Sequence, residues 1–388
     1  MGMILQSFTG SLLLFYLPLA LGAGSCLYYL AVVFASLKFR SQKEESADFT
    51  PAVSILKPVR GIDQGFYECL ASHCRQDYPC FEIIFGLSDP KDHAQWTIAQ
   101  LRRDFPRVPI KVIVVPESRS ANPKMNSLAV MLEEAAHEFI VINDADIRVA
   151  PDYLRNVMRP LAGERVGLVT CLYRGVPSGK LSSVFEALGI GGDFAGQVLL
   201  ASFVEGIKFA LGATMATRKK QIAEIGGLSR WADYLADDFI LGNRIAAAGY
   251  PIRLSHVVVE TLLPRRSFSD LLRQQLRWAR TIRFARPRGY WGLLLTFGIP
   301  FALLAWIIRP YSHLGQAVLA MTLAARLLAA WASGVLVCRD RVIRKFFWLL
   351  PVRDLMALGI WIASFLGTHV VWREERFKIE AGGKIRPA

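Results

Sequence analysis

Charge is missing from the beginning of this 388-residue chain. No charged side chain occurs before Lys38, and the apolar run at 11–37 exceeds the roughly 20 residues that a helix needs to span hydrocarbon. No lysine or arginine precedes this run, which argues against a cleaved signal peptide with a basic start and a shorter apolar core. We therefore expect residues 1–40 to form an uncleaved N-terminal transmembrane anchor.

The sequence also lacks any C-x-x-C pair among its six cysteines. Cys69, Cys74 and Cys80, with His73, have a spacing that fits no common zinc site, and free thiols are ordinary in a reducing cytosol. Internal repeats and low-complexity tracts are absent as well. The length then suits one large soluble domain together with membrane segments.

Apolar residues are abundant, at 53% of the chain, and they are concentrated in a few runs. After the first run, three more follow in the second half of the chain, at 289–308, 310–338 and 346–372. Arg326 interrupts one of them, and Arg353 and Asp354 interrupt another. Ionisable groups at membrane depth mark either a functional pathway or helix pairing, and we favour a simple pair between Arg326 and Asp354.

Basic residues near the ends of these runs indicate the topology. They follow the first run, precede the second and follow the third, whereas only Arg309 lies between the second and the third. The N-terminus is therefore expected outside, and residues of about 40–288 in the cytosol, as in a multi-pass membrane protein. The basic tail at 373–388 ends outside if the run at 346–372 spans, and inside if that run is re-entrant or lies flat.

The chain carries a net charge of +14. Such a charge suits nucleic acid, anionic lipid headgroups or phosphorylated substrates. The membrane spans argue against nucleic acid, so lipid and phosphorylated substrates are the expected partners.

Strands and helices alternate in the expected cytosolic part. Apolar runs predict strands at 52–59, 81–89, 110–116 and 139–143, and helical spacing predicts helices at 62–77, 94–104 and 124–135. This alternation is typical of βαβ units with a mainly parallel sheet, an α/β fold. Ligands of such sheets bind outside the carboxyl ends of the strands, which is where Asp89, Asp92, Asp144 and Asp146 are expected.

Asp144 and Asp146 form a D-x-D pair directly after the apolar strand at 139–143. Two carboxylates at one strand end can share Mg²⁺ or Mn²⁺, which prefers oxygen ligands and completes its shell with water or phosphate. Most D-x-D pairs are solvated loop acids, but the position after a buried strand favours a site for a metal and a diphosphate.

Other polar residues each admit a functional and a structural interpretation. Asp89 and Asp92 contact a nucleotide or form an Asp-Pro turn, and Lys124 meets phosphate or begins a helix as a solvated cation. Asp237 and Asp238 precede a helix and serve as a general base or as caps favoured by the helix dipole.

The segment at 263–288 reads as an amphipathic, arginine-rich interface helix. Arginine and tryptophan at an interface suit anionic headgroups, which explains most of this charge without catalysis. A membrane-surface helix explains the Q-x-x-R-W block of Gln274, Arg277 and Trp278 less well than it explains the charge.

Taken in order, these motifs resemble processive and lipid-directed family-2-type glycosyltransferases of the GT-A fold. The closer resemblance is to the ceramide glucosyltransferase family and its bacterial relatives, including hopanoid-biosynthesis glycosyltransferases. It extends over roughly residues 50–290 and rests on 54-SILKPVRG-61, 76-QDYPCFEIIFGLSD-89, 122-NPKMNSL-128, 144-DADIRV-149, 237-DDF-239 and 274-QQLRW-278.

The resemblance implies an enzyme, a UDP-sugar-dependent hexosyltransferase, that transfers one sugar (glucose or N-acetylglucosamine) to a lipid hydroxyl with inversion. It divides the chain into the anchor (1–40), a cytosolic GT-A catalytic domain (41–262), the interface helix (263–288), C-terminal membrane helices (289–372) and the tail (373–388). By residue, it implies uridine near Asp92 with Asp89 beside it, a nucleotide contact at Lys124, a metal at Asp144 and Asp146, a base at Asp238 next to Asp237, and a diphosphate and acceptor border at Gln274, Arg277 and Trp278.

Two departures bear on the acceptor. The His-containing segment of the animal ceramide enzymes is absent from 186–208, and Asp146 supplies a second D-x-D aspartate that they lack. Both favour a bacterial lipid such as a hopanoid polyol over ceramide. A glucosylceramide-forming enzyme, a polysaccharide synthase and a non-enzymatic lipid-binding membrane protein are the alternatives. The apolar stretch at 198–213 is either an interfacial helix that admits the acceptor or ordinary core.

Overall fold

The computed structural model describes residues 2–42, 48–115, 120–372 and 375–388. Parts of the predicted anchor, of the linker after it, of the strand at 110–116 and of the tail lie outside the described residues. The chain forms two compact units. The helical unit consists of Met1–Gln42, Val184–Phe203 and Ser267–Thr368, and the sheet unit consists of Lys43–Ser183, Val204–Arg266 and His369–Ala388.

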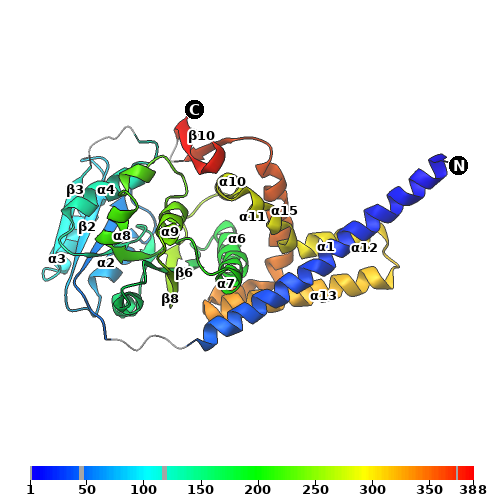
Figure 1. Ribbon diagram of the computed structural model, residues 1–388, viewed down its shortest axis with the longest axis horizontal. Helices are drawn as coiled ribbons and strands as arrows, with labels where there is room; N and C mark the ends of the chain where they lie inside the picture. Colours follow the sequence, from blue (N-terminus) through cyan, green and yellow to red (C-terminus); the bar gives the residue numbers. More distant parts are fainter. Residues whose placement is uncertain (1, 43–47, 116–119, 373–374) are drawn as a thin grey trace. The chain divides into compact units, whose positions relative to one another are not determined.

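An eight-stranded sheet with the order β3-β2-β1-β4-β7-β6-β8-β5 forms the centre of the sheet unit (Figure 1). The first four strands in this order are parallel, as the sequence predicts, and β6 and β8 are parallel too. The other pairs, β4–β7, β7–β6 and β8–β5, are antiparallel. The strands are β1 Val53–Val59, β2 Phe81–Leu87, β3 Ile110–Val114, β4 Phe139–Ile142, β5 Ile147–Arg148, β6 Leu168–Val176, β7 Met215–Arg218 and β8 Ile252–Leu262.

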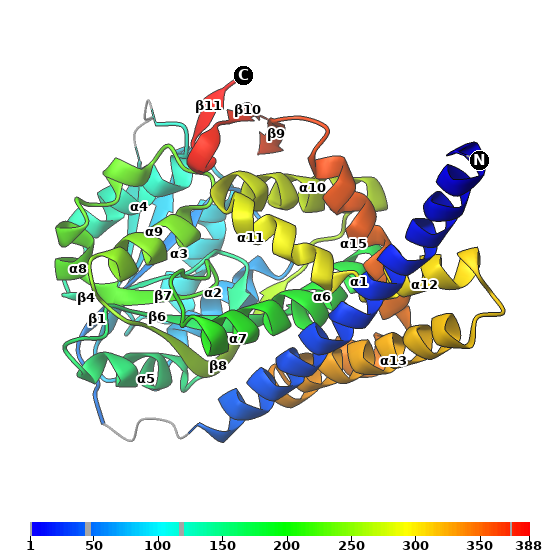
Figure 2. The ribbon, with the colours of Figure 1, turned by 45° about the vertical axis from the view of Figure 1, so that its right-hand side comes forward.

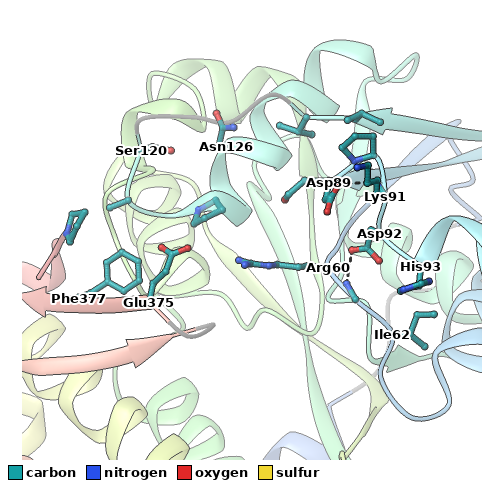
Figure 3. Close-up of a pocket in the computed structure, with 18 residues that line it drawn as sticks. Arg60, Ile62, Asp89, Lys91, Asp92, His93, Ser120, Asn126, Glu375 and Phe377 are labelled. Atoms are coloured by element: carbon teal, nitrogen blue, oxygen red, sulfur yellow. Dashed lines mark hydrogen bonds between the residues drawn. The ribbon is translucent and has the colours of Figure 1, made fainter.

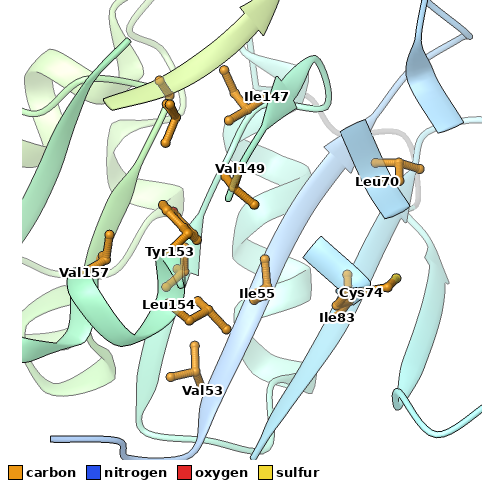
Figure 4. Packing of buried hydrophobic residues seen from close by; sticks show 14 of the residues in the cluster. Val53, Ile55, Leu70, Cys74, Ile83, Ile147, Val149, Tyr153, Leu154 and Val157 are labelled. Atoms are coloured by element: carbon orange, nitrogen blue, oxygen red, sulfur yellow. The ribbon is translucent and has the colours of Figure 1, made fainter. Parts of the chain in front are cut away.

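Helices pack against this sheet and bury its apolar strands on both faces. Every residue of β1 is buried, which is why the strand reads as a continuous apolar run and not as an alternating one. On one face Ile55 lies in a cluster with Leu70 and Leu154 (Figure 4). The helices are α2 Phe66–Cys74, α3 Ala94–Asp104, α4 Pro123–Glu134, α5 Tyr153–Met158, α8 Lys219–Glu224 and α9 Asp237–Ala247, with short 3-10 turns at Arg159–Ala162 and Ser229–Trp231.

The C-terminal tail forms a second, three-stranded antiparallel sheet that belongs to the sheet unit. Its backbone bonds to the segment before α9, from Ile385 N to Asp233 O at 2.8 Å and from Leu235 N to Gly383 O at 3.4 Å. The strands are β9 His369–Trp372, β10 Glu375–Ile379 and β11 Ile385–Pro387, with a 3-10 turn at Ala381–Gly383. The last apolar run therefore does not remain helical to residue 372, because its final residues pair as β9.

The helical unit holds helices that are long and apolar enough to cross a membrane, as expected of a membrane protein. Four qualify among the described residues, at Leu13–Ser41, Leu181–Val204, His313–Val337 and Arg341–Ser364, and the pair Pro287–Thr296 and Gly298–Ile308, bent by 55°, qualifies together. The sequence predicts all of these except Leu181–Val204. The elements are α1 Gly2–Ser41, α6 Leu181–Gly189, a π-helix Ile190–Phe194, α7 Ala195–Val204, α10 Phe268–Ala285, α11 Pro287–Gly292, a 3-10 turn Leu293–Thr296, α12 Gly298–Ile308, α13 His313–Ala330, a π-helix Trp331–Val337, α14 Arg341–Phe346, a 3-10 turn Phe347–Leu349 and α15 Leu350–Ser364.

Small residues let α1 pack closely against α12 and α13 (Figure 2). A Cβ atom on Gly22 would lie 3.1 Å from the Cβ of Ala302, so the two helix backbones approach there as in other membrane helix pairs. Tyr29 covers the break between α11 and α12, because its hydroxyl donates to Thr296 O at 2.8 Å and accepts from Gly298 N at 3.2 Å. These bonds satisfy backbone groups that the bend exposes.

Arg326 and Asp354 form a buried ion pair, which confirms the pairing predicted for them. The Nε and Nη2 atoms of Arg326 donate to the two carboxylate oxygens of Asp354, each at 2.8 Å, and both side chains are 2% exposed. Arg326 also donates to Gly192 O at 3.0 Å and to the carboxylate of Asp193. The π-helix Ile190–Phe194 thus supplies the remaining acceptors for this cation.

We predict that Asp354→Asn lowers the thermal unfolding midpoint of the detergent-purified protein. Removing one partner leaves a buried charge without its counter-ion, which typically costs about 3–5 kcal/mol. The double variant Arg326→Met/Asp354→Leu should recover much of the loss, since it removes both charges. An Asp354→Asn variant that unfolds at the wild-type midpoint would contradict this account of the pair.

Candidate active site

Lys124 lies between two of the predicted acids in the sheet unit. Its Nζ atom is 2.7 Å from Oδ1 of Asp144 and 2.8 Å from Oδ2 of Asp237. Lys124 comes from the first turn of α4, Asp144 follows β4, and Asp237 begins α9. Burial alone lowers the pKa of Lys124, but the two carboxylates outweigh burial and raise the pKa above its ordinary value. Three segments that are distant in sequence thus meet around one cation.

Asp238 joins this cluster across Gly212. Gly212 N donates to Oδ2 of Asp238 at 2.9 Å, and Phe239 N donates to Oδ1 at 2.7 Å. A Cβ atom on Gly212 would lie 3.1 Å from Oδ2 of Asp144 and 3.4 Å from Oδ2 of Asp238, so the two carboxylates flank this glycine. Burial and then the charge of Asp237 raise the pKa of Asp238 to about 6. A carboxylate with that pKa is well placed to act as a base near neutral pH.

Asp146, the second acid of the D-x-D pair, is bonded to the neighbouring strand β8. Its Oδ2 accepts a hydrogen bond from the hydroxyl of Thr261, on β8, at 2.8 Å. Burial and then the charge of Asp144 raise the pKa of Asp146 to about 6. The side chain of Asp144 is 40% exposed, so this carboxylate is open to solvent or a ligand.

A buried lysine bonds to the backbone of the D-x-D turn. Lys57, on β1, is fully buried, and its Nζ donates to the carbonyl oxygen of Asp144 at 3.1 Å and lies 3.3 Å from Nε2 of His73. Burial lowers the pKa of Lys57 to about 8. Lys57 is not among the predicted site residues, although a lysine inside an apolar strand run is a visible signal.

Asp89 and Asp92 line a cavity of about 1420 Å³ (Figure 3). Both also make the bonds of a turn, because Asp92 accepts from Ala94 N at 2.9 Å and Asp89 accepts from Lys91 N at 2.7 Å. Asp92 accepts in addition from Gly61 N, in the loop after β1, at 2.7 Å. The structural and the functional interpretations are therefore compatible. Asp92 holds the loop after β1 at the edge of the cavity.

The first turn of α4 connects this cavity to the acid cluster. Pro123 and Asn126 line the cavity, and Lys124 between them contacts Asp144 and Asp237. Asn122 caps the helix by accepting from Lys124 N and Met125 N, and its side chain donates to Tyr234 O at 2.8 Å. The helix start is thus fixed to the segment that leads into α9.

Two kinds of cavity residue are missed by the sequence analysis. Arg60 follows β1 at the same sheet edge as the acids, and the strand-end rule applied to cations would have found it. Glu375, Phe377 and Pro387 come from the tail, and no local pattern predicts that the tail returns to this cavity.

Gln274, Arg277 and Trp278 belong to α10 of the helical unit. Within that unit, Gln274 Nε2 donates to Oε1 of Glu186 on α6 at 3.1 Å. The next residue, Gln275, accepts from Nη2 of Arg353 at 3.3 Å. The predicted site residues are thus divided between the units, with the acids and Lys124 in one and the Q-x-x-R-W block in the other.

Known proteins are similar to this chain in sequence and in fold. The profile of glycosyl transferase family 21 matches residues 18–385. Ceramide glucosyltransferases 1 and 3 of Caenorhabditis elegans are 23% and 25% identical, each over 93% of this chain and over 79% and 80% of their own lengths. The solved structure of a mannosyltransferase from Pyrobaculum calidifontis, in complex with GDP-mannose and Mn²⁺, superimposes with a TM-score of 0.54 at 20% identity, over 91% of this chain and 99% of that one.

The structural likeness establishes a GT-A fold for the sheet unit, and the sequence match establishes the kind of enzyme. The chain is a sugar-transferring enzyme and belongs to glycosyl transferase family 21.

Proposed function

We propose that this enzyme transfers a single glucose or N-acetylglucosamine from a UDP-sugar to a lipid hydroxyl, with inversion. The observation that carries the proposal is the acid cluster around Lys124, which shares the first turn of α4 with a cavity of about 1420 Å³. That volume is ample for a nucleotide sugar, because ordinary ligand sites measure roughly 300–1,000 Å³. Asp89 and Asp92 at the cavity edge would border the uridine, and Arg60 would meet the diphosphate.

The residues of the D-x-D pair fit a divalent cation, Mg²⁺ or Mn²⁺. Asp146 is half-buried beside a second carboxylate, an arrangement that a cation would relieve. Among the described residues no group of three or more histidine, cysteine or acidic side chains surrounds one point. Asp144 and Asp146 would therefore share the metal with diphosphate oxygens and water, as Mg²⁺ usually binds. When bound, the metal would neutralise charge on the departing diphosphate.

The residues of the cluster take distinct roles. Asp238 would accept the proton of the acceptor hydroxyl, and the two backbone N–H groups that bond its carboxylate hold it in one orientation. Lys124 would keep Asp144 and Asp237 together and place positive charge near the phosphates. Gln274, Arg277 and Trp278 are proposed to hold the diphosphate and border the acceptor.

For the acceptor we propose a bacterial membrane lipid such as a hopanoid polyol. The second D-x-D aspartate and the missing histidine segment support this choice. The names of the relatives favour ceramide as the second candidate, since both nematode proteins are ceramide glucosyltransferases. The helix Leu181–Val204, whose last residues begin the apolar stretch at 198–213, would border the lipid.

The connectivity also supports a membrane topology, with the sheet unit in the cytosol of a bacterial inner-membrane protein. Both ends of 267–368 join the sheet unit, so this segment must cross the membrane an even number of times. We propose that the bent pair at 287–308 and the helix at 313–337 cross as a hairpin, that 341–364 is re-entrant or lies flat, and that α1 crosses once. The segment 184–203 also joins the sheet unit at both of its ends, so we propose that the helix Leu181–Val204 enters the membrane without crossing it.

Detergent-purified protein should release UDP from UDP-glucose or UDP-N-acetylglucosamine only when Mg²⁺ or Mn²⁺ and a lipid acceptor are present. The assay pairs each donor, with GDP-mannose as the comparison, with a hopanoid polyol or ceramide and analyses the product by mass spectrometry. One sugar per lipid supports the proposal, and a long sugar chain would identify a polysaccharide synthase. Liposome binding without any turnover or UDP-sugar binding would leave only a lipid-binding scaffold.

A further inference from the structure

The C-terminal tail lines the cavity from the side opposite Asp89 and Asp92. Glu375 and Phe377, two residues apart on β10, both line the cavity. Pro387, on β11, pairs with Phe377 and lines it too. Figure 3 shows the Arg60 side chain extending from the Asp89–Asp92 side of the cavity toward Glu375. The tail, which the sequence presents only as a basic terminus, is thus one wall of this cavity.

Glu375 and Arg60 face each other without pairing. Neither forms an ion pair or a side-chain hydrogen bond within the described ranges 48–115, 120–372 and 375–388. A cation and a carboxylate that both line one cavity leave room for a ligand that is anionic on one side and rich in hydrogen-bond donors on the other. A sugar nucleotide has this character, with a diphosphate for Arg60 and vicinal hydroxyls for a carboxylate acceptor.

The same tail is anchored to the polypeptide that carries the candidate base. Asp233 and Leu235 bond to the tail backbone, and Lys384 Nζ lies 5.7 Å from the ring centroid of Tyr234. Asn122 also donates a hydrogen bond to this segment, at Tyr234 O, and the segment continues into Asp237 and Asp238. A wall fixed in this way keeps Glu375 at a defined place relative to the acid cluster.

We propose that the C-terminal sheet is part of the donor-binding site and that Glu375 is a specificity-determining residue that accepts hydrogen bonds from a vicinal diol of the donor. The inference rests on the proposed function, because it takes the sugar nucleotide as the occupant of the cavity. The diol belongs either to the ribose or to the transferred sugar. The two sources are separated by comparing a nucleotide that has only the ribose with one that has both.

The test measures the affinity of the full-length, detergent-purified protein for UDP and for UDP-glucose by isothermal titration calorimetry. Glu375→Ala should weaken binding about tenfold or more, which is the usual effect of losing hydrogen bonds to a charged group. The affinity of Glu375→Gln should lie between those of the wild type and Glu375→Ala. Weaker binding of both ligands assigns the ribose, and weaker binding of UDP-glucose alone assigns the transferred sugar. Lys378→Ala is the matched control, because Lys378 is exposed and lies on the opposite face of β10.

Unchanged affinity for both ligands in Glu375→Ala would overturn the inference and leave the proposed function intact. Tighter binding would overturn it too, since that is the result of a carboxylate that merely repels the diphosphate. A wild-type protein that binds neither UDP nor UDP-glucose would overturn the proposed function and this inference together.

Discussion

Asp238→Asn should lower kcat by roughly 10²- to 10⁴-fold, because a proton acceptor positioned on the attacking hydroxyl contributes about that much. Asparagine keeps the size of the side chain but cannot take the proton. Asp238 lies at the start of α9 and does not line the cavity that we assign to the nucleotide, so the dissociation constant for UDP should change by no more than about threefold. Initial rates of UDP release, with UDP binding measured in parallel, check both expectations.

The control for this variant is Asp77→Asn, which removes an exposed carboxylate whose side chain is 82% accessible. Thermal unfolding of both variants separates lost chemistry from lost structure. The pH dependence gives a second test, because burial raises the pKa of Asp238 to about 6. The carboxylate form is present above that pH, so wild-type kcat/KM should fall as the pH decreases through about 6. Wild-type turnover in Asp238→Asn would end the assignment of the base.

Chelation of divalent cations should lower turnover by roughly 10³-fold or more, since a metal supplies several kcal/mol of charge stabilisation to the departing diphosphate. Mg²⁺ or Mn²⁺ should restore it. Asp144→Asn should show the same loss and should not respond to added metal. A second measurement, independent of turnover, compares the affinity of each protein for UDP in the presence of Mn²⁺ and in the presence of EDTA.

In the wild type, Mn²⁺ should tighten UDP binding by roughly tenfold or more, and in Asp144→Asn it should have little effect. Asp152→Asn is a suitable control, because Asp152 is an exposed acid whose carboxylate, among the described residues, accepts a hydrogen bond only from Asn156 nearby. Full activity of the wild type after exhaustive chelation would refute the metal assignment and would place the neutralising charge on Lys124 and Arg60 alone.

The strand ends of the first half of the sheet were predictable because they obey local rules. The apolar runs ending near Leu87 and Ile142 are β2 and β4, and the acids after them lie at the carboxyl edge as a parallel sheet requires. The family resemblance is confirmed by the match over residues 18–385. The signals for these strand ends and acids lie within a few residues of one another in the sequence.

Contacts between distant segments were not predictable in the same way. Lys124 was expected to meet phosphate, but nothing in its neighbourhood shows that it also bridges Asp144 and Asp237. The sequence presents the tail as a basic end, and it is the long-range contacts of Ile385, Leu235 and Lys384 that reveal it as part of the sheet unit. Such contacts depend on the tertiary fold of the whole chain, and no short sequence motif indicates them.

Mass spectrometry of total membrane lipids, from cells that carry the wild-type enzyme or Asp238→Asn, tests most directly whether converging acids drive sugar transfer to a lipid. The account predicts a glycolipid with one added hexose or N-acetylhexosamine in the wild-type sample and its absence with Asp238→Asn. Identical lipid profiles in the two samples, with both proteins present at equal amounts, would contradict it.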